Sequence, residues 1–342
     1  MAVILPVVAF VASAWLSRRL YNPASWFYKL DHPNPRSLHE SPTPRGGGLA
    51  ILAATVICGL IAAAMFPVNK ELAWIAGATL LVAGISFIDD WLNLHLSYRI
   101  VVHVFAAALL VGGGLGLAGI TVPGSVWALV PPLALALSLV FIVWMINLYN
   151  FMDGMDGFAG GMAVIGFGSF AVLGYLAGQP LFAVLSSIVA AAAGGFLLFN
   201  FPPAQLFMGD TGSSVLGLVA ATFMLWADRD GIFPLWVGVL VFSPFVVDAT
   251  VTLVKRILRR ERFWEAHKTH YYQRLVQLGW GHRRTVLWEY VLMFLCALSA
   301  LLVRELSPAA QWALIATWLA GYLAIILTVH QLETRRETLI TK

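Results

Sequence analysis

The stretch ALVPPLALALSLVFIVWMINLYNFMDGMDG, residues 128–157, begins with an apolar run that carries no charge through residue 146. An uncharged run of this length is typical of a helix that crosses a membrane. Two aspartates three residues apart, Asp153 and Asp156, then stand among glycines at the end of the run. A carboxylate at the mouth of a membrane segment is costly unless it is solvated, paired or bound to a metal. The stretch therefore indicates both a membrane fold and a polar site at one membrane face.

The composition of the whole chain extends this interpretation. Of 342 residues, 60% are hydrophobic and only 11% are charged, whereas soluble domains carry about 25% charged residues. The alternation of a membrane β-barrel is not found, and no polar stretch is long enough to fold alone. The sequence predicts one all-α domain over 1–342, a polytopic helical bundle in the membrane. The two cysteines, Cys58 and Cys296, lie in apolar runs and are read as small hydrophobic residues.

Eleven apolar segments are candidate membrane spans, and ten or eleven membrane helices are expected. The first segment has its basic residues after the apolar core, which favours an uncleaved span over a signal peptide. The candidate spans are 2–17, 47–66, 72–88, 101–117, 128–146, 162–177, 181–199, 214–227, 235–254, 286–303 and 312–330.

Lysine and arginine are distributed unequally between the two sets of connections. The odd-numbered connections and the C-terminal tail hold 18 of the 21 basic residues, and the even-numbered ones hold Lys70, Arg229 and Arg304. Positive charge accumulates on the cytoplasmic side of membrane proteins. The N-terminus is therefore expected in the periplasm and the C-terminus in the cytoplasm. All the connections rich in unusual polar residues are odd-numbered, and together they are expected to form one cytoplasmic active site: 18–46, 89–100, 147–161, 200–213 and 255–285.

Two of these connections hold a pair of aspartates close together in sequence. Asp89 and Asp90 are adjacent at the end of a span, where one of them can act as a base or a metal ligand, although two solvated turn residues remain an alternative. The amides Asn147 and Asn150 precede Asp153 and Asp156, as expected for groups that hydrogen-bond a ribose or a base. The alternative there is a turn rich in Asn and Asp.

The motif GDTGSS, residues 209–214, places Asp210 at the start of a predicted helix. Free backbone N–H groups at a helix N-terminus favour phosphate, and an aspartate beside them is suited to Mg²⁺. Gly209 and Thr211 would contact the phosphate, and Phe207 would stack on a base. An ordinary helix cap is the alternative.

Basic residues supply the remaining candidates. Arg45 lies in SPTPRGGG, where a cation among glycines and prolines suits a pyrophosphate or lipid phosphate, or merely marks a kinked entry to the second span. The 255–285 connection holds His267, His270 and Arg274 among many cations. Phosphate contact is favoured over zinc there, and a topology signal or anionic-lipid contact is the alternative. Asp248 lies within a span and is expected to pair inside the bundle or line the site.

Five motifs together resemble the polyprenyl-phosphate N-acetylhexosamine-1-phosphate transferases, a family of bacterial membrane enzymes with eukaryotic dolichol relatives. They occur in the family's order across 37–275: SLHESPTPRGGG, the Asp89–Asp90 pair, NLYNFMDGMDG, GDTGS and HKTHYYQRL. The resemblance implies that a polyprenyl phosphate, undecaprenyl phosphate in bacteria, attacks the β-phosphorus of a UDP-N-acetyl sugar. UMP leaves and a polyprenyl-diphospho-sugar stays in the membrane.

The resemblance also implies roles for the candidate residues. Catalysis would fall to Asp89, Asp90, Asp210, His267 and His270, with Asp210 and Asp90 binding Mg²⁺, for which Mn²⁺ can substitute. Substrate binding would fall to Arg45, Asn147, Asn150, Asp153, Asp156, Phe207, Gly209, Thr211 and Arg274. The implied location is the bacterial inner membrane, and the expected partners are both substrates, membrane lipids and a second copy in a homodimer, without nucleic acid.

Two departures from the family pattern point to one branch. The peptidoglycan branch resembles DDxxK followed by consecutive histidines, whereas this chain has Asn93 at the fourth position and Lys268 and Thr269 between its histidines. The sequence looks closer to the branch that initiates O-antigen or related surface polysaccharides, with N-acetylglucosamine, N-acetylfucosamine or N-acetylquinovosamine as the sugar. A transporter or flippase and a membrane scaffold are the rival functions, although carboxylates at span ends without internal repeats disfavour a transporter.

Overall fold

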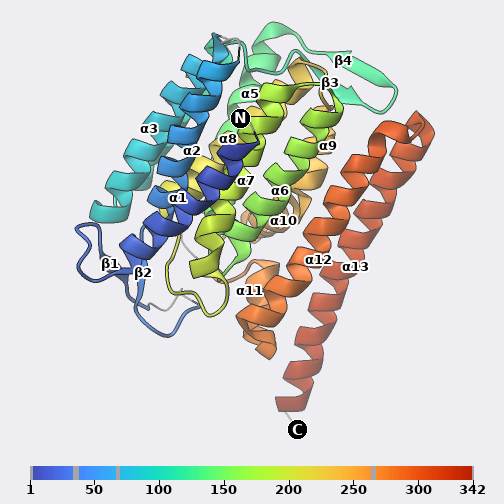
Figure 1. Cartoon of the computed structure of the whole chain (residues 1–342). Coiled ribbons are helices and arrows are strands. Elements are labelled where there is room, and N and C mark those ends of the chain that lie inside the picture. Colours follow the sequence, from blue (N-terminus) through green and yellow to red (C-terminus); the bar gives the residue numbers. More distant parts are fainter. Residues whose placement is uncertain (1–2, 34–37, 67–69, 263–266, 341–342) are drawn as a thin grey trace.

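The computed structural model describes residues 3–33, 38–66, 70–262 and 267–340. Helices dominate it, and the strands form two short hairpins (Figure 1). In chain order the elements are α1 (Ile4–Tyr21), β1 (Lys29–Asp31), β2 (Thr43–Arg45), α2 (Gly47–Met65), α3 (Glu71–Leu92), α4 (Leu96–Gly112), β3 (Gly119–Val122), β4 (Ser125–Ala128), α5 (Pro131–Phe151), α6 (Phe158–Leu176), α7 (Pro180–Asn200), α8 (Asp210–Arg229), α9 (Leu235–Val241), α10 (Ser243–Leu258), α11 (Tyr271–Leu275), η1 (Val276–Trp280), α12 (Gly281–Leu302), η2 (Val303–Glu305) and α13 (Pro308–Ile340).

The prediction of a polytopic helical membrane protein is confirmed. Within the described residues, nine helical segments are long and apolar enough to cross a membrane, and the bent pair α9–α10 makes a tenth. The helix α4 is apolar but shorter, at 17 residues. Each of the eleven predicted spans overlaps one of these segments. Several helix ends differ from the predicted bounds by four residues or more, and two differences matter most here: α9 and α10 meet at an angle of 86°, and α8 starts at Asp210, four residues before the predicted span.

Helix α8 is the buried centre of the bundle, since every residue from Thr211 to Ala227 is buried. Helices α2, α3 and α5 pack around it. Glycines permit this packing: a Cβ on Gly48 of α2 would lie 2.2 Å from the backbone nitrogen of Gly212 on α8. Membrane helices commonly associate through such small residues, because the backbones can then approach closely.

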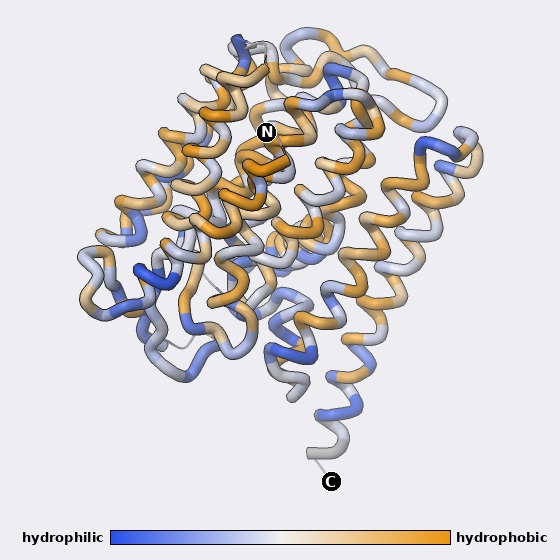
Figure 2. Tube along the Cα trace, in the orientation of Figure 1, coloured by the Kyte–Doolittle hydropathy of each residue, from blue (hydrophilic) through white to orange (hydrophobic). Residues whose placement is uncertain are grey.

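Helices α12 and α13 form a hairpin beside the rest of the bundle (Figure 1). Much of the surface of α13 is exposed and apolar, including Leu319, Leu323 and Leu327. Apolar exposure of this kind is suited to contact with lipid. In Figure 2 the hydrophilic residues concentrate at the ends of the helices and in the loops, while the helix bodies are largely hydrophobic.

The hairpin β1–β2, which the all-α prediction did not include, lies at the end of the bundle where α3 and α5 finish and α8 begins; we call this the site end (Figure 1). Its strand β2 is joined to the loop before α8. The Phe207 amide donates to the carbonyl of Pro44 at 2.8 Å, and the amides of Gly46 and Gly47 donate to the Phe207 carbonyl at 3.1 and 2.9 Å. These bonds bring two connections that are far apart in sequence to one place.

Candidate active site

A cavity of about 200 Å³ at the site end gathers side chains from four of the five polar connections. We call it the carboxylate cavity, and the fifth connection, 89–100, adjoins it through hydrogen bonds to the start of α8. The described residues that line the cavity are Asp31, Leu38, His39, Arg45, Asp153, Gly154, Met155, Asp156, Asn200, Phe207, Gly209, Asp210, Gln273 and His282.

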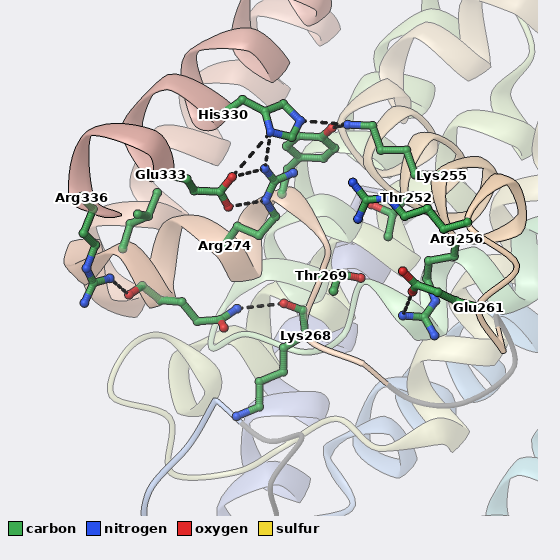
Figure 3. A pocket seen from close by; sticks show the side chains of 14 residues that line it. Thr252, Lys255, Arg256, Glu261, Lys268, Thr269, Arg274, His330, Glu333 and Arg336 are labelled. Atoms are coloured by element: carbon green, nitrogen blue, oxygen red, sulfur yellow. Dashed lines mark hydrogen bonds and ion pairs between the residues drawn. The ribbon is translucent and has the colours of Figure 1, made fainter. Parts of the chain in front are cut away.

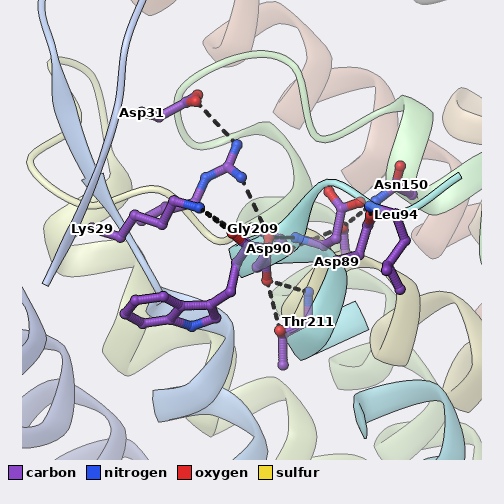
Figure 4. A network of polar contacts seen from close by, with 12 residues as sticks. Lys29, Asp31, Asp89, Asp90, Leu94, Asn150, Gly209 and Thr211 are labelled. Atoms are coloured by element: carbon purple, nitrogen blue, oxygen red, sulfur yellow. Dashed lines mark hydrogen bonds and ion pairs between the residues drawn. The ribbon is translucent and has the colours of Figure 1, made fainter. Parts of the chain in front are cut away.

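Asp90, at the end of α3, caps the N-terminus of α8 from outside that helix (Figure 4). Its Oδ1 accepts from the Asp210 amide at 2.9 Å, and its Oδ2 accepts from the amide and hydroxyl of Thr211 at 3.0 and 2.6 Å. A carboxylate here satisfies free amides and is stabilised by the helix dipole. Gly209 has a φ of 79°, and a Cβ there would lie 3.1 Å from both Asp90 oxygens. The glycine therefore makes room for the cap.

Two cations of the β1–β2 hairpin contact Asp90, one at its backbone and one at its carboxylate. Lys29 donates to the backbone carbonyls of Asp90 and Trp91 at 2.7 and 3.0 Å, at the C-terminus of α3. Arg45 places Nη1 3.6 Å from Asp90 Oδ1 and Nη2 3.1 Å from Asp31 Oδ1. Lys29 and Arg45 are paired in the hairpin register, so one short element delivers both charges.

Arg99 of α4 joins the two other carboxylates at the centre. Its Nη1 lies 2.8 Å from Asp89 Oδ2 and 3.0 Å from Asp210 Oδ2. Its Nη2 donates to Asn150 Oδ1 at 3.5 Å, and Asn150 in turn donates to the hydroxyl of Ser213 at 3.0 Å. One cationic nitrogen is thus held between two carboxylate oxygens that belong to different helices.

Asp153 and Asp156 both line the carboxylate cavity but differ in their bonding. Asp156 accepts from the Ala204 amide at 3.0 Å and lies 3.1 Å from Nδ1 of His282, so it ties the loop before α8 to α12. No hydrogen bond or ion pair joins the Asp153 carboxylate to another described residue. Burial raises the pKa of Asp153 well above its usual value, and the nearby Asp210 and Asp90 add to this rise. Asp153 is therefore the carboxylate left free to meet a ligand.

Among the predicted residues that do not line the carboxylate cavity, Asn147 and Arg274 make their contacts elsewhere. Asn147 lies within the bundle, where its amide donates to the Val143 carbonyl at 2.7 Å and lies 3.4 Å from His103. Arg274 faces a different cavity and donates through Nε to Glu333 at 2.6 Å. Ser37 of the first motif lies outside the described residues.

The two predicted histidines stand beside the cavity without lining it, and their rings are 4.8 Å apart. His270 precedes α11, and its Nδ1 lies 3.2 Å from Asp248, whose carboxylate also accepts from the amides of Tyr271 and Tyr272. Asp248 therefore pairs inside the bundle, as expected. Burial lowers the pKa of His267 to about 4, helped by His270 and Arg256. His267 is thus neutral at physiological pH.

Sequence reasoning missed several polar residues of the site, among them Arg99, Lys29 and His282. Arg99 had a signal, because it is the only basic residue of the connection that follows Asp89 and Asp90. Lys29 and His282 had none, since their contacts depend on a hairpin and on the start of α12, which are remote in sequence.

The donor chemistry at the centre fits a divalent cation. Within the described part of the chain, no three His, Cys, Asp or Glu side chains are grouped to enclose a metal. Asp89 Oδ2 and Asp210 Oδ2 nevertheless converge on one cationic nitrogen. Mg²⁺ is typically held by one or two carboxylates, with substrate phosphates and waters as its other ligands. Two converging carboxylates satisfy that need.

These features define a polytopic helical membrane protein with a charged site at one end of its bundle. Comparison with known proteins gives its family. The profile of glycosyl transferase family 4 matches residues 72–228, from α3 to α8. A "Decaprenyl-phosphate N-acetylglucosaminephosphotransferase" of Mycolicibacterium smegmatis is 31% identical, covering 96% of this chain and 87% of that protein. The chain belongs to glycosyl transferase family 4, in agreement with the resemblance of its motifs.

Two further relatives cover most of the chain. A "Probable undecaprenyl-phosphate N-acetylglucosaminyl 1-phosphate transferase" of Bacillus subtilis is 29% identical, over 88% of this chain and 82% of that protein. A "Phospho-N-acetylmuramoyl-pentapeptide-transferase" of Halalkalibacterium halodurans is also 29% identical, over 75% of this chain and 82% of that protein. Relatives named for different sugars therefore have similar identity to this chain.

Proposed function

We propose that this protein transfers an N-acetylhexosamine 1-phosphate from a UDP-sugar to a polyprenyl phosphate, undecaprenyl phosphate in particular. The observation that carries the proposal is the cluster at the head of α8, where Arg99 bridges Asp89 and Asp210. Phosphoryl transfer depends mainly on positioning and on charge neutralisation. A cluster of carboxylates and cations beside a helix N-terminus supplies both, and the relatives named as polyprenyl-phosphate sugar-phosphate transferases support this reaction.

In the proposed reaction an oxygen of the lipid phosphate forms a bond to the β-phosphorus of the UDP-sugar. The bond between that phosphorus and the oxygen bridging it to the α-phosphate breaks, and UMP leaves with that oxygen. The product is a polyprenyl-diphospho-sugar. The bond between the sugar C1 and its oxygen is not touched, so the anomeric configuration is retained.

We assign the divalent ion to Asp210 and Asp89, in place of the pair Asp210 and Asp90 expected from the motifs. Both oxygens of Asp90 already accept hydrogen bonds from the first turn of α8, whereas Asp89 Oδ2 faces Asp210 across Arg99. A bound Mg²⁺ would offset the negative charge of the phosphates. In this scheme Asp90 is a positioning residue that fixes the first turn of α8 and with it Asp210.

The neighbouring side chains then divide between the two substrates. Arg99 and Arg45 are the cations closest to the carboxylates and would bind phosphate oxygens through charge-assisted hydrogen bonds. Phe207 lines the carboxylate cavity with His39 packed against its ring at 4.9 Å. Phe207 and the unpaired Asp153 would contact the uridine. His267 and His270 would act from behind the cavity wall, where the His270 amide donates to the side chain of Gln273 at 3.3 Å.

The wider role follows the distribution of charge. The basic connections at the site end support a cytoplasmic location for that end in a bacterial inner membrane, where UDP-sugars are available. Asn93, which departs from the peptidoglycan pattern, ends α3 with a φ of 51°, a conformation that asparagine tolerates. We propose that the product initiates an O-antigen or related surface polysaccharide, with N-acetylglucosamine, N-acetylfucosamine or N-acetylquinovosamine as the sugar.

The test is release of UMP by the purified protein. UDP-N-acetylglucosamine and its two alternatives are each supplied with and without undecaprenyl phosphate and Mg²⁺. The proposal predicts release that requires both additions, and loss of release in Asp210→Asn. Arg304→Gln is the control, because Arg304 is exposed and lies in η2, the turn between α12 and α13. This turn is at the end of the helix hairpin away from the site end (Figure 1). A transporter of lipid-linked sugars would release no UMP under any condition.

A further inference from the structure

A second cavity, of about 430 Å³, lies at the site end between α10, α11 and α13 (Figure 3). Among the described residues, none lines both this cavity and the carboxylate cavity. We call it the cationic cavity, after the six basic side chains in its wall. They are Lys255, Arg256, Arg259, Lys268, Arg274 and Arg336.

The positive charge of this cavity is only partly neutralised. Two carboxylates line it: Glu261 lies 2.8 Å from Arg256, and Glu333 accepts from Arg274 at 2.6 Å. Four cations therefore exceed the acids of the wall. Among them, no ion pair joins Arg259 to a described carboxylate. Such an excess in a concave, partly desolvated space favours an anion that carries more than one charge.

The hydrogen-bonding groups in the wall of the cavity favour a phosphate as the anion. Thr269 and Tyr271 bring hydroxyls, and arginine side chains present planar forks that match phosphate oxygens. The walls are also the ends of the membrane helices α10 and α13 (Figures 1 and 3), so we expect the cavity at the depth of the lipid headgroups. Basic pockets between membrane helices at that depth bind acidic headgroups.

We propose that the cationic cavity is a phosphate-binding site, separate from the carboxylate cavity. Its phosphate comes from the headgroup of an anionic phospholipid or from a free phosphate compound. The site goes beyond the proposed transferase activity, because nothing in it touches the Asp89–Arg99–Asp210 cluster.

The segment between the two cavities connects phosphate binding in the cationic cavity to the residues of the carboxylate cavity. Lys268, Tyr271 and Arg274 face the cationic cavity, whereas Gln273 lines the carboxylate cavity. The hydroxyl of Tyr272 donates to the Phe151 carbonyl at 3.3 Å, beside the loop that carries Asp153. A phosphate bound to one face of this segment therefore restrains residues of the other face, and it raises the thermal stability of the full chain.

The experiment measures binding directly on the full-length protein. One arm counts phosphatidylglycerol molecules retained in native mass spectra, after reconstitution in phosphatidylcholine with increasing phosphatidylglycerol. The other arm titrates detergent-purified protein with inorganic pyrophosphate by calorimetry. Saturable binding in the lipid arm assigns a headgroup, and saturable binding in the pyrophosphate arm alone assigns a soluble phosphate.

Matched variants connect the binding to the cavity. Arg259→Gln and Lys268→Gln should each weaken it about fivefold, and together about 25-fold, as expected for one cation each near a membrane surface. Arg260→Gln is the control, because this neighbour carries the same charge, is exposed and does not line the cavity. Equal losses in Arg259→Gln and Arg260→Gln, or no saturable binding in either arm, would overturn the proposal. Both arginines are exposed, so circular dichroism should show the wild-type helix content in each variant.

Discussion

Replacing Arg99 by glutamine removes the cation that Asp89 and Asp210 share. Because one nitrogen contacts their Oδ2 atoms at 2.8 and 3.0 Å, these two oxygens are at most about 5.8 Å apart. Two unit charges at that separation repel by about 3 kcal/mol at an effective dielectric constant of 20. A divalent ion between them relieves that repulsion, so Arg99→Gln should bind Mn²⁺ more tightly than the wild type, by about a hundredfold.

The same substitution should slow transfer, because it removes a donor positioned for phosphate charge. Loss of one such donor typically costs 10²–10³ in kcat. Mn²⁺ affinity is measured from the free-ion signal in electron paramagnetic resonance, and turnover from UMP release at saturating metal. Adding Asp210→Asn to Arg99→Gln should cancel the gain in affinity. Unchanged or weaker Mn²⁺ binding in Arg99→Gln would refute the reasoning, since Arg99 and the metal would then not compete for one place.

Four further predictions concern other groups at the site end. Asp90→Asn keeps one acceptor oxygen but loses the charge at the head of α8, so it should lower both the melting temperature and kcat, with a loss of about 2 kcal/mol in the free energy of unfolding. Asp153→Asn breaks no hydrogen bond within the described chain, so it should slow transfer without lowering the melting temperature. Gly209→Ala should disturb the Asp90 cap and strongly reduce UMP release. Gly178→Ala is the control, because Gly178 has a similar φ of 71° but open space where the Cβ would lie; this variant should lose only about 1 kcal/mol of stability through backbone strain and retain activity. The pKa of His267 is 6.5 in the unfolded chain and about 4 in the folded one, so the native state should lose stability as the pH falls from 7 toward 4. His267→Gln should therefore reduce the drop in melting temperature measured between pH 7 and pH 5.

The membrane architecture was predictable because long apolar runs leave few alternatives in a bilayer. The run before Asn147 is a helix as expected, and the other ten predicted spans also contain helices. The bend between α9 and α10 was not predictable from hydropathy, since the apolar run continues through Phe242 without a break. The hairpin β1–β2 was not predicted for a different reason: its strands are three residues long and depend on pairing with each other.

For the site, the spacing of the motifs in the sequence indicated which connections contribute residues, but it did not indicate the direction of each side chain. Asp153 and Asp156 share a motif, yet one is free and the other is bonded to His282 and Ala204. Asn147 carries the same amide as Asn150 but turns into the bundle. These choices depend on neighbours contributed by distant helices, which local sequence does not reveal.

Anomalous diffraction from crystals soaked in Mn²⁺ would test the central claim most directly. If the head of α8 is the catalytic centre, one strong peak should lie about 2.1 Å from carboxylate oxygens of both Asp89 and Asp210, with the Arg99 guanidinium moved out of their shared position. A peak that contacts neither carboxylate, or Mn²⁺ bound elsewhere while Arg99 still joins the pair, would contradict it.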